Sequence, residues 1–316
     1  MSHDRPTPPP LAPWVSEEAR ARFAAEVAGA AAPADLAGRR VFYRQFNQDR
    51  LDVARKLFPV TEEAAVIAGV DVHIVRPVKA AARPGPRPVL ICLHGGGFMW
   101  GEGPGALLEA VPIAAVARVE VIAVEYRMAP EHVFPAATDD IAAVYRALLA
   151  DETVGSIGLY GCSAGAALTA QTTARLIADG DPLPAAIAML HAAGVNLGGD
   201  SVTTAALLNG MPEAGAPPSL AALPYLAACD PNDPLVFPGE HPDMLARFPP
   251  SLLISATRDF AASAVSVMHR RLLAAGAQAD LVIFDGLWHA HHVATDLPES
   301  RETFELMARF FQRHLA

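Results

Sequence analysis

Residues 161–165 read Gly-Cys-Ser-Ala-Gly and place a serine midway between two glycines. An apolar run, 156–160, precedes this motif, and an alanine-rich stretch of helical pattern, 166–178, follows it. A serine at a sharp turn from strand to helix projects above the sheet edge as a nucleophile, and the flanking glycines let strand and helix approach closely. So short a motif also arises by chance in a chain rich in alanine and glycine. The other parts of a catalytic site must therefore be sought separately.

Three consecutive glycines, 95–97, follow a predicted core strand directly. Their amides carry no Cβ shield, so a substrate oxygen can reach them, and a flexible linker would not stand between a core strand and an apolar Phe-Met-Trp run. The amide that begins the helix after the serine points at the same place. The expected oxyanion donors are Gly96, Gly97 and Ala164, and the residues expected to support the loop are His94 and Gly95.

The base that would take the serine proton must be one of 11 histidines. His289 follows the predicted strand 280–284, in the kind of loop where a parallel sheet presents functional residues. His291 and His292 are close neighbours and are the competing candidates. We prefer His289 for its position after the strand.

The acid that would orient this histidine should also follow a strand. Asp259 stands after the predicted strand 251–255, where a carboxylate can accept a hydrogen bond from the imidazole and stabilise the imidazolium. Asp285 is the alternative, but it precedes the histidine closely and is expected to shape that turn. The order serine, aspartate, histidine is that of the α/β-hydrolase fold and differs from the orders in chymotrypsin and subtilisin.

Apolar strands and helices alternate along the part of the chain that holds these residues. Continuous apolar runs are typical of parallel strands buried on both faces. The predicted strands cover 88–93, 119–124, 157–160, 185–190, 251–255 and 280–284, and the helices between and after them cover 105–117, 137–150, 164–178, 261–275 and 299–314. A hairpin, 63–67 and 70–77, and two helices, 16–32 and 45–58, come first. The predicted fold class is α/β, a mostly parallel sheet with helices on both faces and a helical cap.

The interval between the predicted strands 185–190 and 251–255 breaks this alternation, because it holds helical fragments, glycine and proline but no clear strand. A long insertion between sheet strands is usually functional. We expect the cap to be formed by residues 1–60 and 191–244, and the α/β core by residues 61–190 and 245–316. The last strand would be a sheet edge and is a candidate for pairing two chains.

Composition excludes several classes of partner. The 316-residue chain has a net charge of −10 and no cluster of Lys and Arg, which disfavours nucleic acid and anionic membranes. Cys92, Cys162 and Cys229 are far apart and lack metal-ligand spacing, which fits a reducing compartment and predicts no metal site. No run approaches the roughly 20 apolar residues of a membrane span, and the Pro-rich start lacks the apolar core of a signal peptide. We therefore expect a cytoplasmic protein.

Together these segments resemble the bacterial hormone-sensitive-lipase-like esterases, the family IV lipolytic enzymes of the α/β-hydrolase fold. The resemblance is carried by His94–Phe98, Tyr126–His132 with 134–137, Gly161–Gly165, Asp233–Leu235, Arg258-Asp259 and Gly286–His289. It implies hydrolysis of small carboxylic esters with short to medium acyl chains, a cap made of the N-terminal helices and the insertion, and no cofactor. Members commonly carry Asp or Thr before the nucleophile, where this chain has Cys162. We expect that side chain to pack beside the turn.

Apolar residues near the predicted site are candidates for the substrate pocket, although single aromatic and methionine side chains are as often plain packing. They are Phe98, Met99, Trp100, Leu207, Leu208 and Met211. The same three catalytic residues would also serve a lactone, carbamate or amide hydrolase, and pocket shape would decide between them. A ligand-binding receptor on this fold is a third hypothesis, which the presence of His289 disfavours because such receptors lack that histidine.

Two further sets of polar residues are expected to be structural. His191 follows a predicted sheet strand, a position that invites a substrate role, but a structural histidine is the preferred interpretation. The acidic residues Glu131, Asp139 and Asp140 are expected to brace Arg127 and the neighbouring loops.

Overall fold

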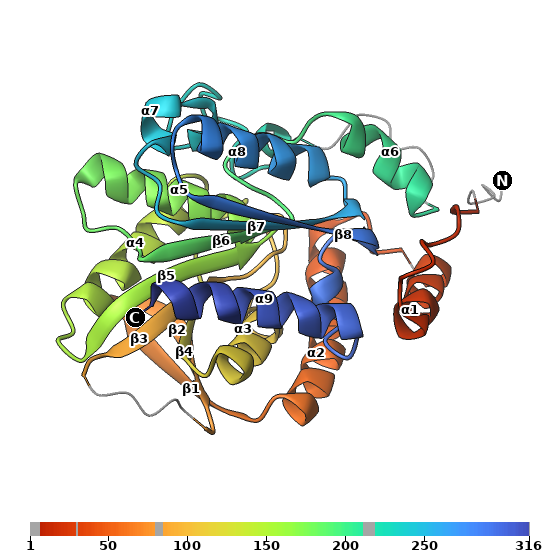
Figure 1. The fold of residues 1–316 in the computed structure, drawn as a ribbon, viewed down its shortest axis with the longest axis horizontal. Coiled ribbons are helices and arrows are strands. Elements are labelled where there is room, and N and C mark those ends of the chain that lie inside the picture. Colours follow the sequence, from red (N-terminus) through yellow and green to blue (C-terminus); the bar gives the residue numbers. More distant parts are fainter. Residues whose placement is uncertain (1–6, 30, 80–84, 211–218, 316) are drawn as a thin grey trace.

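The computed structural model describes residues 7–29, 31–79, 85–210 and 219–315 (Figure 1). Its strands form one sheet in the order β1-β2-β4-β3-β5-β6-β7-β8. β2 runs antiparallel to both β1 and β4, and the other neighbours in the sheet run parallel. The strands are β1 Val60–Ile67, β2 Val70–Pro77, β3 Arg87–Leu93, β4 Glu120–Val124, β5 Val154–Cys162, β6 Ala186–Leu190, β7 Ser251–Arg258 and β8 Ala279–Trp288.

Helices cover both faces of this sheet (Figure 1). Along β3, Val89 and Ile91 belong to the core shared with α4, α5 and α8, whereas Leu90 and Cys92 belong to the core shared with α3 and α9. Successive side chains of a strand point to opposite faces, so a continuous apolar run buries both. The prediction of a mostly parallel, doubly covered sheet is confirmed. The helices are α1 Glu17–Ala28, α2 Leu36–Leu57, α3 Pro104–Ala117, α4 Ala136–Leu149, α5 Ala164–Asp179, α6 Asp200–Leu208, α7 Pro242–Leu245, α8 Ala262–Ala274 and α9 Pro298–His314.

The second N-terminal helix, α2, begins well before the predicted range 45–58. Asp35 caps it, because its side chain accepts a hydrogen bond from the amide of Gly38. The first turns carry the arginines at 39, 40 and 44, so the apolar periodicity that marks a helix in a sequence is weak there. The helix packs along α3, and the buried side chains on its inner face include Leu51 and Ala54.

Arg40 fastens α2 to the loops of the core. Its guanidinium donates hydrogen bonds to the carbonyls of Met99, at 2.8 Å, and Ala129, at 3.0 Å. Its two terminal nitrogens, one of which also serves Ala129, pair with the carboxylate of Glu131, each over 2.7 Å. A planar guanidinium is suited to such a fork of acceptors, so one side chain ties the helix to two loops.

Arg258, at the end of β7, fastens two other segments that lie outside the sheet. One terminal nitrogen donates to the carbonyl of Leu208 at the end of α6, over 2.6 Å. The other donates to the carbonyls of Pro9 and Pro10, each at 2.8 Å. The side chain is almost fully buried, and this burial lowers its pKa from the ordinary value. All three acceptors are backbone groups.

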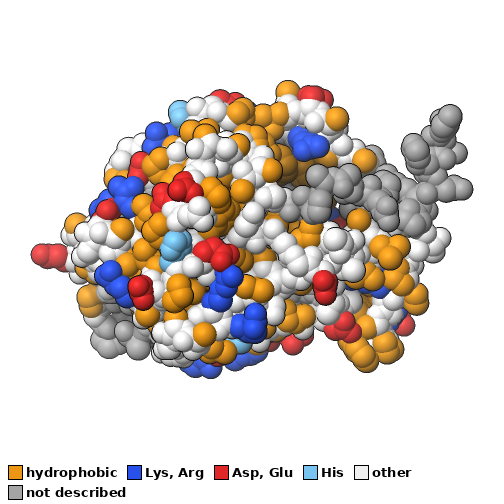
Figure 2. Space-filling model, turned by 90° about the horizontal axis from the view of Figure 1, so that it is seen from above, with side chains coloured by type: hydrophobic (Ala, Val, Ile, Leu, Met, Phe, Trp, Pro, Cys, Tyr) orange, Lys and Arg blue, Asp and Glu red, His pale blue; other side chains and the backbone are white. Residues whose placement is uncertain are grey.

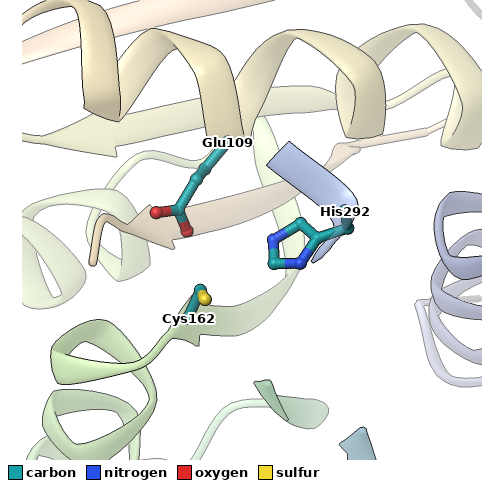
Figure 3. A group of neighbouring side chains, drawn as sticks. All are labelled: Glu109, Cys162 and His292. Atoms are coloured by element: carbon teal, nitrogen blue, oxygen red, sulfur yellow. The ribbon is translucent and has the colours of Figure 1, made fainter. Parts of the chain in front are cut away.

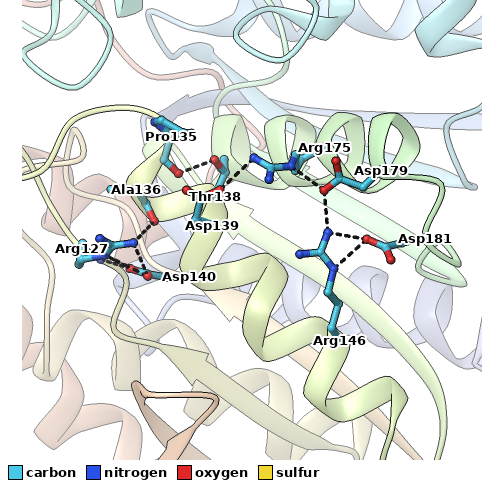
Figure 4. Close-up of polar contacts among 10 residues, drawn as sticks. All are labelled: Arg127, Pro135, Ala136, Thr138, Asp139, Asp140, Arg146, Arg175, Asp179 and Asp181. Atoms are coloured by element: carbon cyan, nitrogen blue, oxygen red, sulfur yellow. Dashed lines mark hydrogen bonds and ion pairs between the residues drawn. The ribbon is translucent and has the colours of Figure 1, made fainter.

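Ion pairs join α4 to α5 and to the segment that follows it (Figure 4). Arg175 contacts Asp139 and Asp179, and Arg146 contacts Asp179 and Asp181. Exposed pairs of this kind contribute about 0–1 kcal/mol each. The network therefore orients helix surfaces and adds little to the free energy of unfolding.

Of the acidic residues expected to brace Arg127, Asp140 does so. Its carboxylate accepts from both the backbone amide and the guanidinium of Arg127 at 2.9 Å (Figure 4). Glu131 does not contact Arg127 but braces the neighbouring loop through Arg40. The expectation is wrong for Asp139, which pairs with Arg175 of α5. Successive residues of a helix point about 100° apart, so Asp139 and Asp140 cannot share one partner.

The last strand, β8, extends beyond the predicted range 280–284 to Trp288. Within the described residues it pairs with β7 alone and so forms an edge of the sheet. An edge strand offers unpaired backbone groups to another chain. Pairing of two chains through β8 stays a prediction.

Charged side chains are intermixed on the face over α5, α7 and α8, and Lys and Arg do not gather there into one patch (Figure 2). In the described part of the chain, none of the helices combines the length and the apolar character needed to cross a bilayer.

Candidate active site

The Gly-Cys-Ser-Ala-Gly motif forms the turn from β5 to α5, and Ser163 stands at its tip. Ser163 has φ 55° and ψ −118°, a conformation that a residue with a side chain rarely adopts. A Cβ on Gly165 would lie 1.9 Å from the carbonyl oxygen of Leu93, and one on Gly161 would lie 2.4 Å from the backbone of Gly165. Only glycine fits at either position, because strand and helix are in backbone contact.

One imidazole joins the serine to an acid. The Nε2 atom of His289 lies 3.0 Å from Ser163 Oγ, and its Nδ1 atom lies 2.7 Å from Asp259 Oδ1. The ring of Phe260 stacks on that of His289, with centroids 4.2 Å apart. The three polar residues come from the carboxyl ends of β5, β7 and β8, and the structure brings them together as the sequence predicts.

Asp259 is fully buried and accepts hydrogen bonds from several segments. Besides His289, the donors are the hydroxyl of Ser255 at 2.6 Å, the amide of Ala261 at 2.9 Å and Nδ1 of His191 at 2.7 Å. Burial by itself raises the pKa of Asp259, but the attraction and hydrogen bonds of the two histidines outweigh it and hold that pKa well below its usual range. The group is therefore a carboxylate.

His191 binds Oδ2 of the acid, whereas His289 binds Oδ1, and the two rings lie edge to face with centroids 5.4 Å apart. His191 follows β6, is fully buried and has φ 59°, a strained value for a histidine. Burial lowers the pKa of His191, so the ring is neutral and donates from Nδ1. The sequence interpretation of a structural residue missed this contact with the acid.

The alternative base and acid candidates face other partners. His291 and His292 are buried and lie against the ring of His191. Asp285 lies within β8 and accepts a hydrogen bond from the hydroxyl of Thr257 in β7 at 2.8 Å, so it joins two strands and does not shape the turn as expected. No hydrogen bond among the described residues connects any of these three side chains to Ser163.

The glycine loop after β3 is held by buried aromatic contacts. His94 donates from Nδ1 to the carbonyl of Gly95 at 2.8 Å, and the hydroxyl of Tyr126 donates to the carbonyl of His94 at 2.7 Å. The His94 and Tyr126 rings stack with centroids 4.3 Å apart. Gly96 and Gly97 both have positive φ, and within the described residues neither amide donates to another group. Both line the same cavity as Ser163 and Ala164.

Glu109, in the middle of α3, binds this loop from behind. Its Oε1 accepts a hydrogen bond from the amide of Gly95 at 2.7 Å, and the carboxyl also accepts from the amide of Cys162. Burial raises the pKa of Glu109 to about 8, against the lowering effect of the two amides. The residue keeps a small exposed part, which borders the cavity. It is the only charged residue of α3. A single charged residue in an otherwise apolar helix is the feature of the sequence that could have indicated a buried carboxyl with polar partners.

A cavity of about 530 Å³ lies over Ser163 and His289. Its walls come from the core, from α2 and from the insertion after β6. The lining residues outside the catalytic loops include Tyr43, Phe46, Asn47, Trp100, Leu108, Leu197, Leu220, Leu223 and Val293. The rings of Tyr43 and Trp100 stack in parallel, with centroids 5.0 Å apart. Lys, Arg and Asp are absent from the described lining, so the cavity suits an uncharged ligand.

Of the residues expected to line the pocket, the structure brings Trp100 to the cavity. The side chain of Phe98 is fully buried and stacks on Tyr225, and Met99 packs into the core beneath the loop. Leu207 is 57% exposed to solvent, and Leu208 is likewise outside the lining. Met211 lies outside the described residues.

A second hollow, of about 630 Å³, opens at the far end of the sheet, where β3 and β4 begin. It is lined by Arg76, Arg87, Arg118 and Glu120 among others, and none of its lining residues belongs to the cavity over Ser163. Because it lies away from the serine, we assign it no part in the chemistry.

Residues 90–293 match the family model described as alpha/beta hydrolase fold. The chain is 30% identical over 243 residues to an acetyl-hydrolase of Streptomyces hygroscopicus, covering 75% of this chain and 78% of that one. It resembles the crystal structure of esterase E25, with TM-score 0.80, 30% identity and 98% of each chain covered. It also resembles an esterase of the bacterial hormone-sensitive lipase family, with TM-score 0.79, 27% identity and 93% and 96% of the two chains covered.

The raised pKa of Glu109 predicts a pH-dependent difference in stability between the native protein and Glu109→Gln. The ordinary pKa of a glutamate is 4.5, whereas the pKa of Glu109 in the folded protein is about 8. Between these two pH values the carboxyl is ionised in the unfolded chain and still protonated in the folded one. The free energy of unfolding of the native protein therefore falls as pH rises, and that of the variant lacks this fall. We expect the variant to gain on the order of 1–3 kcal/mol of free energy of unfolding relative to the native protein over this range, since one pKa unit corresponds to about 1.4 kcal/mol. The exposed part of Glu109 at the cavity reduces the difference below the full value.

Urea unfolding at pH 5, 6.5 and 8 measures this difference. Glu131→Gln is the control, because Arg40 lowers the pKa of Glu131 to about 2 and its difference from the native protein should stay flat from pH 5 to 8. An equally flat difference for Glu109→Gln contradicts the prediction.

Proposed function

The chain belongs to the bacterial hormone-sensitive-lipase family of α/β-hydrolase-fold esterases, and from this membership we propose that it hydrolyses small uncharged esters with Ser163, His289 and Asp259 as a catalytic triad. The family relationship supports a carboxylesterase. The observation that carries the proposal is the single imidazole of His289, with one nitrogen 3.0 Å from the serine oxygen and the other 2.7 Å from a buried carboxylate.

In the proposed reaction, Ser163 Oγ attacks the ester carbonyl carbon while Nε2 of His289 takes the hydroxyl proton. The carbonyl oxygen becomes an oxyanion, which the amides of Gly96, Gly97 and Ala164 are placed to receive as they line the same cavity. His289 then returns the proton to the leaving alkoxide, and an acyl-serine remains. Water, deprotonated by the same imidazole, attacks the acyl carbon and releases the acid and the free serine.

Asp259 acts on the histidine and not on the ester. It fixes the ring so that Nδ1 carries a proton and Nε2 presents a lone pair to the serine, and its charge stabilises the imidazolium that forms. The four hydrogen bonds to its carboxylate support this role, because they keep the group ionised and its orientation fixed. His191 supplies one of these bonds and is proposed to act as a positioning residue.

The cavity supports an ester with a short to medium acyl chain. A volume of about 530 Å³ is in the range of small-molecule sites, and its apolar walls with no cation favour an uncharged substrate. Lactones could be hydrolysed by the same chemistry and are the alternative substrates. Carbamates and amides are further alternatives. A non-catalytic receptor is the remote alternative, against which the contact between His289 and Ser163 speaks.

We also propose that residues 1–60 and 191–244 act as the cap of this enzyme, over a core of 61–190 and 245–316. The contribution of α2 and of the insertion after β6 to the cavity wall supports this division. Substrate choice would then reside largely in the cap, whereas the bond-breaking groups reside in the core.

Ser163→Ala is expected to lower kcat for p-nitrophenyl butyrate by at least about 10⁴-fold, as removal of a triad nucleophile does. The native protein, but not the variant, should be labelled covalently by a fluorophosphonate probe. Thermal unfolding of the variant is the control for an intact fold. Retention of most of the hydrolysis by Ser163→Ala would falsify the triad, and absence of labelling of the native protein would favour the receptor.

Asp259→Asn and Asp285→Asn form a matched pair that identifies the acid. An asparagine at 259 removes the charge that stabilises the imidazolium, so kcat should fall by roughly 10³–10⁴-fold. Asp285 contacts Thr257, and its substitution should change kcat less than about threefold. Steady-state kinetics on one ester give both values. If the larger loss falls on Asp285→Asn, the assignment of the acid is wrong.

A series of p-nitrophenyl esters, measured beside a panel of lactones, tests the substrate class. The limited cavity volume of about 530 Å³ predicts that kcat/KM for the dodecanoate is at least about tenfold lower than for the butanoate, because the longer chain extends beyond the apolar walls. Uniform rates along the series contradict the size limit. Higher kcat/KM for the lactones would move the proposal to a lactone hydrolase.

A further inference from the structure

The turn that carries Ser163 lies against the glycine loop that follows β3. Cys162 ends β5, and its neighbour Gly161 pairs with Leu93 at the end of β3. A Cβ on Gly95 would lie 3.2 Å from the carbonyl oxygen of Cys162 and 3.4 Å from a carboxyl oxygen of Glu109. The glycine loop, the serine turn and the side chain of Glu109 therefore meet at one place.

Glu109 reaches this place from α3. Figure 3 shows its side chain pointing from the helix toward Cys162, with the ring of His292 directed at the same place from the other side. One carboxyl accepts from the Gly95 amide at 2.7 Å and from the Cys162 amide. The ligand-type atoms of Glu109, Cys162 and His292 all lie within 4.8 Å of one another, so the carboxyl is closely surrounded.

The two amides that Glu109 binds belong to the two halves of the predicted oxyanion hole. Gly95 directly precedes the donors Gly96 and Gly97, and Cys162 precedes Ser163 and the donor Ala164. A side chain that bridges them fixes how far the glycine loop lies from the serine turn. Oxyanion donors act only at hydrogen-bond distance, so a shift of either half weakens the stabilisation of the transition state.

Resting on the triad and oxyanion donors proposed above, we propose that Glu109 is a positioning residue that locks the glycine loop to the nucleophile turn and sets the geometry of the oxyanion hole. It touches neither the reacting atoms nor the leaving group.

The neutral form of Glu109 suits this task, because a negative charge behind the oxyanion site would oppose the charge that develops there. The ionisable groups that face the carboxyl are Cys92 of β3, Tyr126 after β4, Tyr160 and Cys162 of β5, and His292 after β8. Burial raises the pKa values of the thiols and phenols and lowers that of His292, so all five are uncharged at neutral pH. None of them offsets a charge on Glu109.

Glu109→Gln and Glu109→Met test the proposal as a matched pair. Glutamine keeps an acceptor oxygen at the same reach, whereas methionine has similar length and offers no acceptor to the amides. With p-nitrophenyl butyrate at pH 7, we expect kcat of Glu109→Gln within about threefold of the native value, and kcat of Glu109→Met lower by about 10–100-fold with KM within about threefold. Above pH 8, Glu109→Gln should retain kcat while the native protein loses it.

Fluorophosphonate labelling and thermal unfolding accompany the kinetics. Native kcat in Glu109→Met overturns the proposal, as does an equal loss of kcat in both variants, which indicates a merely structural role. Failure of the native protein to hydrolyse the ester or to be labelled overturns the proposed function instead, so the two failures are distinguishable. Rescue by glutamine, together with the split between kcat and KM, supports positioning.

Discussion

The buried carboxylate of Asp259 is the interaction on which the arrangement of the site depends. An ionised group without water is costly unless several donors reach it. Here the donors arrive from the ends of β6, β7 and β8 and from the start of α8. These neighbouring strands must therefore end at the same edge of the sheet. The carboxylate of Asp259 that binds the strand ends also binds His289, the histidine that faces Ser163.

The residues that follow strands were the predictable part of the site. Ser163, Asp259 and His289 each come after an apolar run, and parallel strands end at a common edge, so spacing along the chain sufficed to bring them together. The cavity wall was much less predictable. Leu207 of the short helix α6 faces solvent and Phe98 faces the core, because the rotation of a short helix or of a loop depends on contacts that no local pattern encodes.

The supporting polar residues were missed for a different reason. His191 and Glu109 carry no motif, and each acquires its role from a partner far away in the sequence. Glu109 stands alone among apolar residues in α3. This isolation indicates that a buried carboxyl has polar partners, but it does not indicate which residues they are. Cys162, the residue before Ser163, lies beside this carboxyl, a contact that no local pattern indicates.

Arg258 binds α6 and the N-terminal segment through main-chain carbonyls alone. Side chains at positions 9, 10 and 208 are thus free to vary without disturbing these contacts. A change in segment length is a different matter, because a shifted backbone would leave a nearly buried guanidinium without its acceptors. Point substitutions at these two anchors should therefore be tolerated far better than insertions or deletions there.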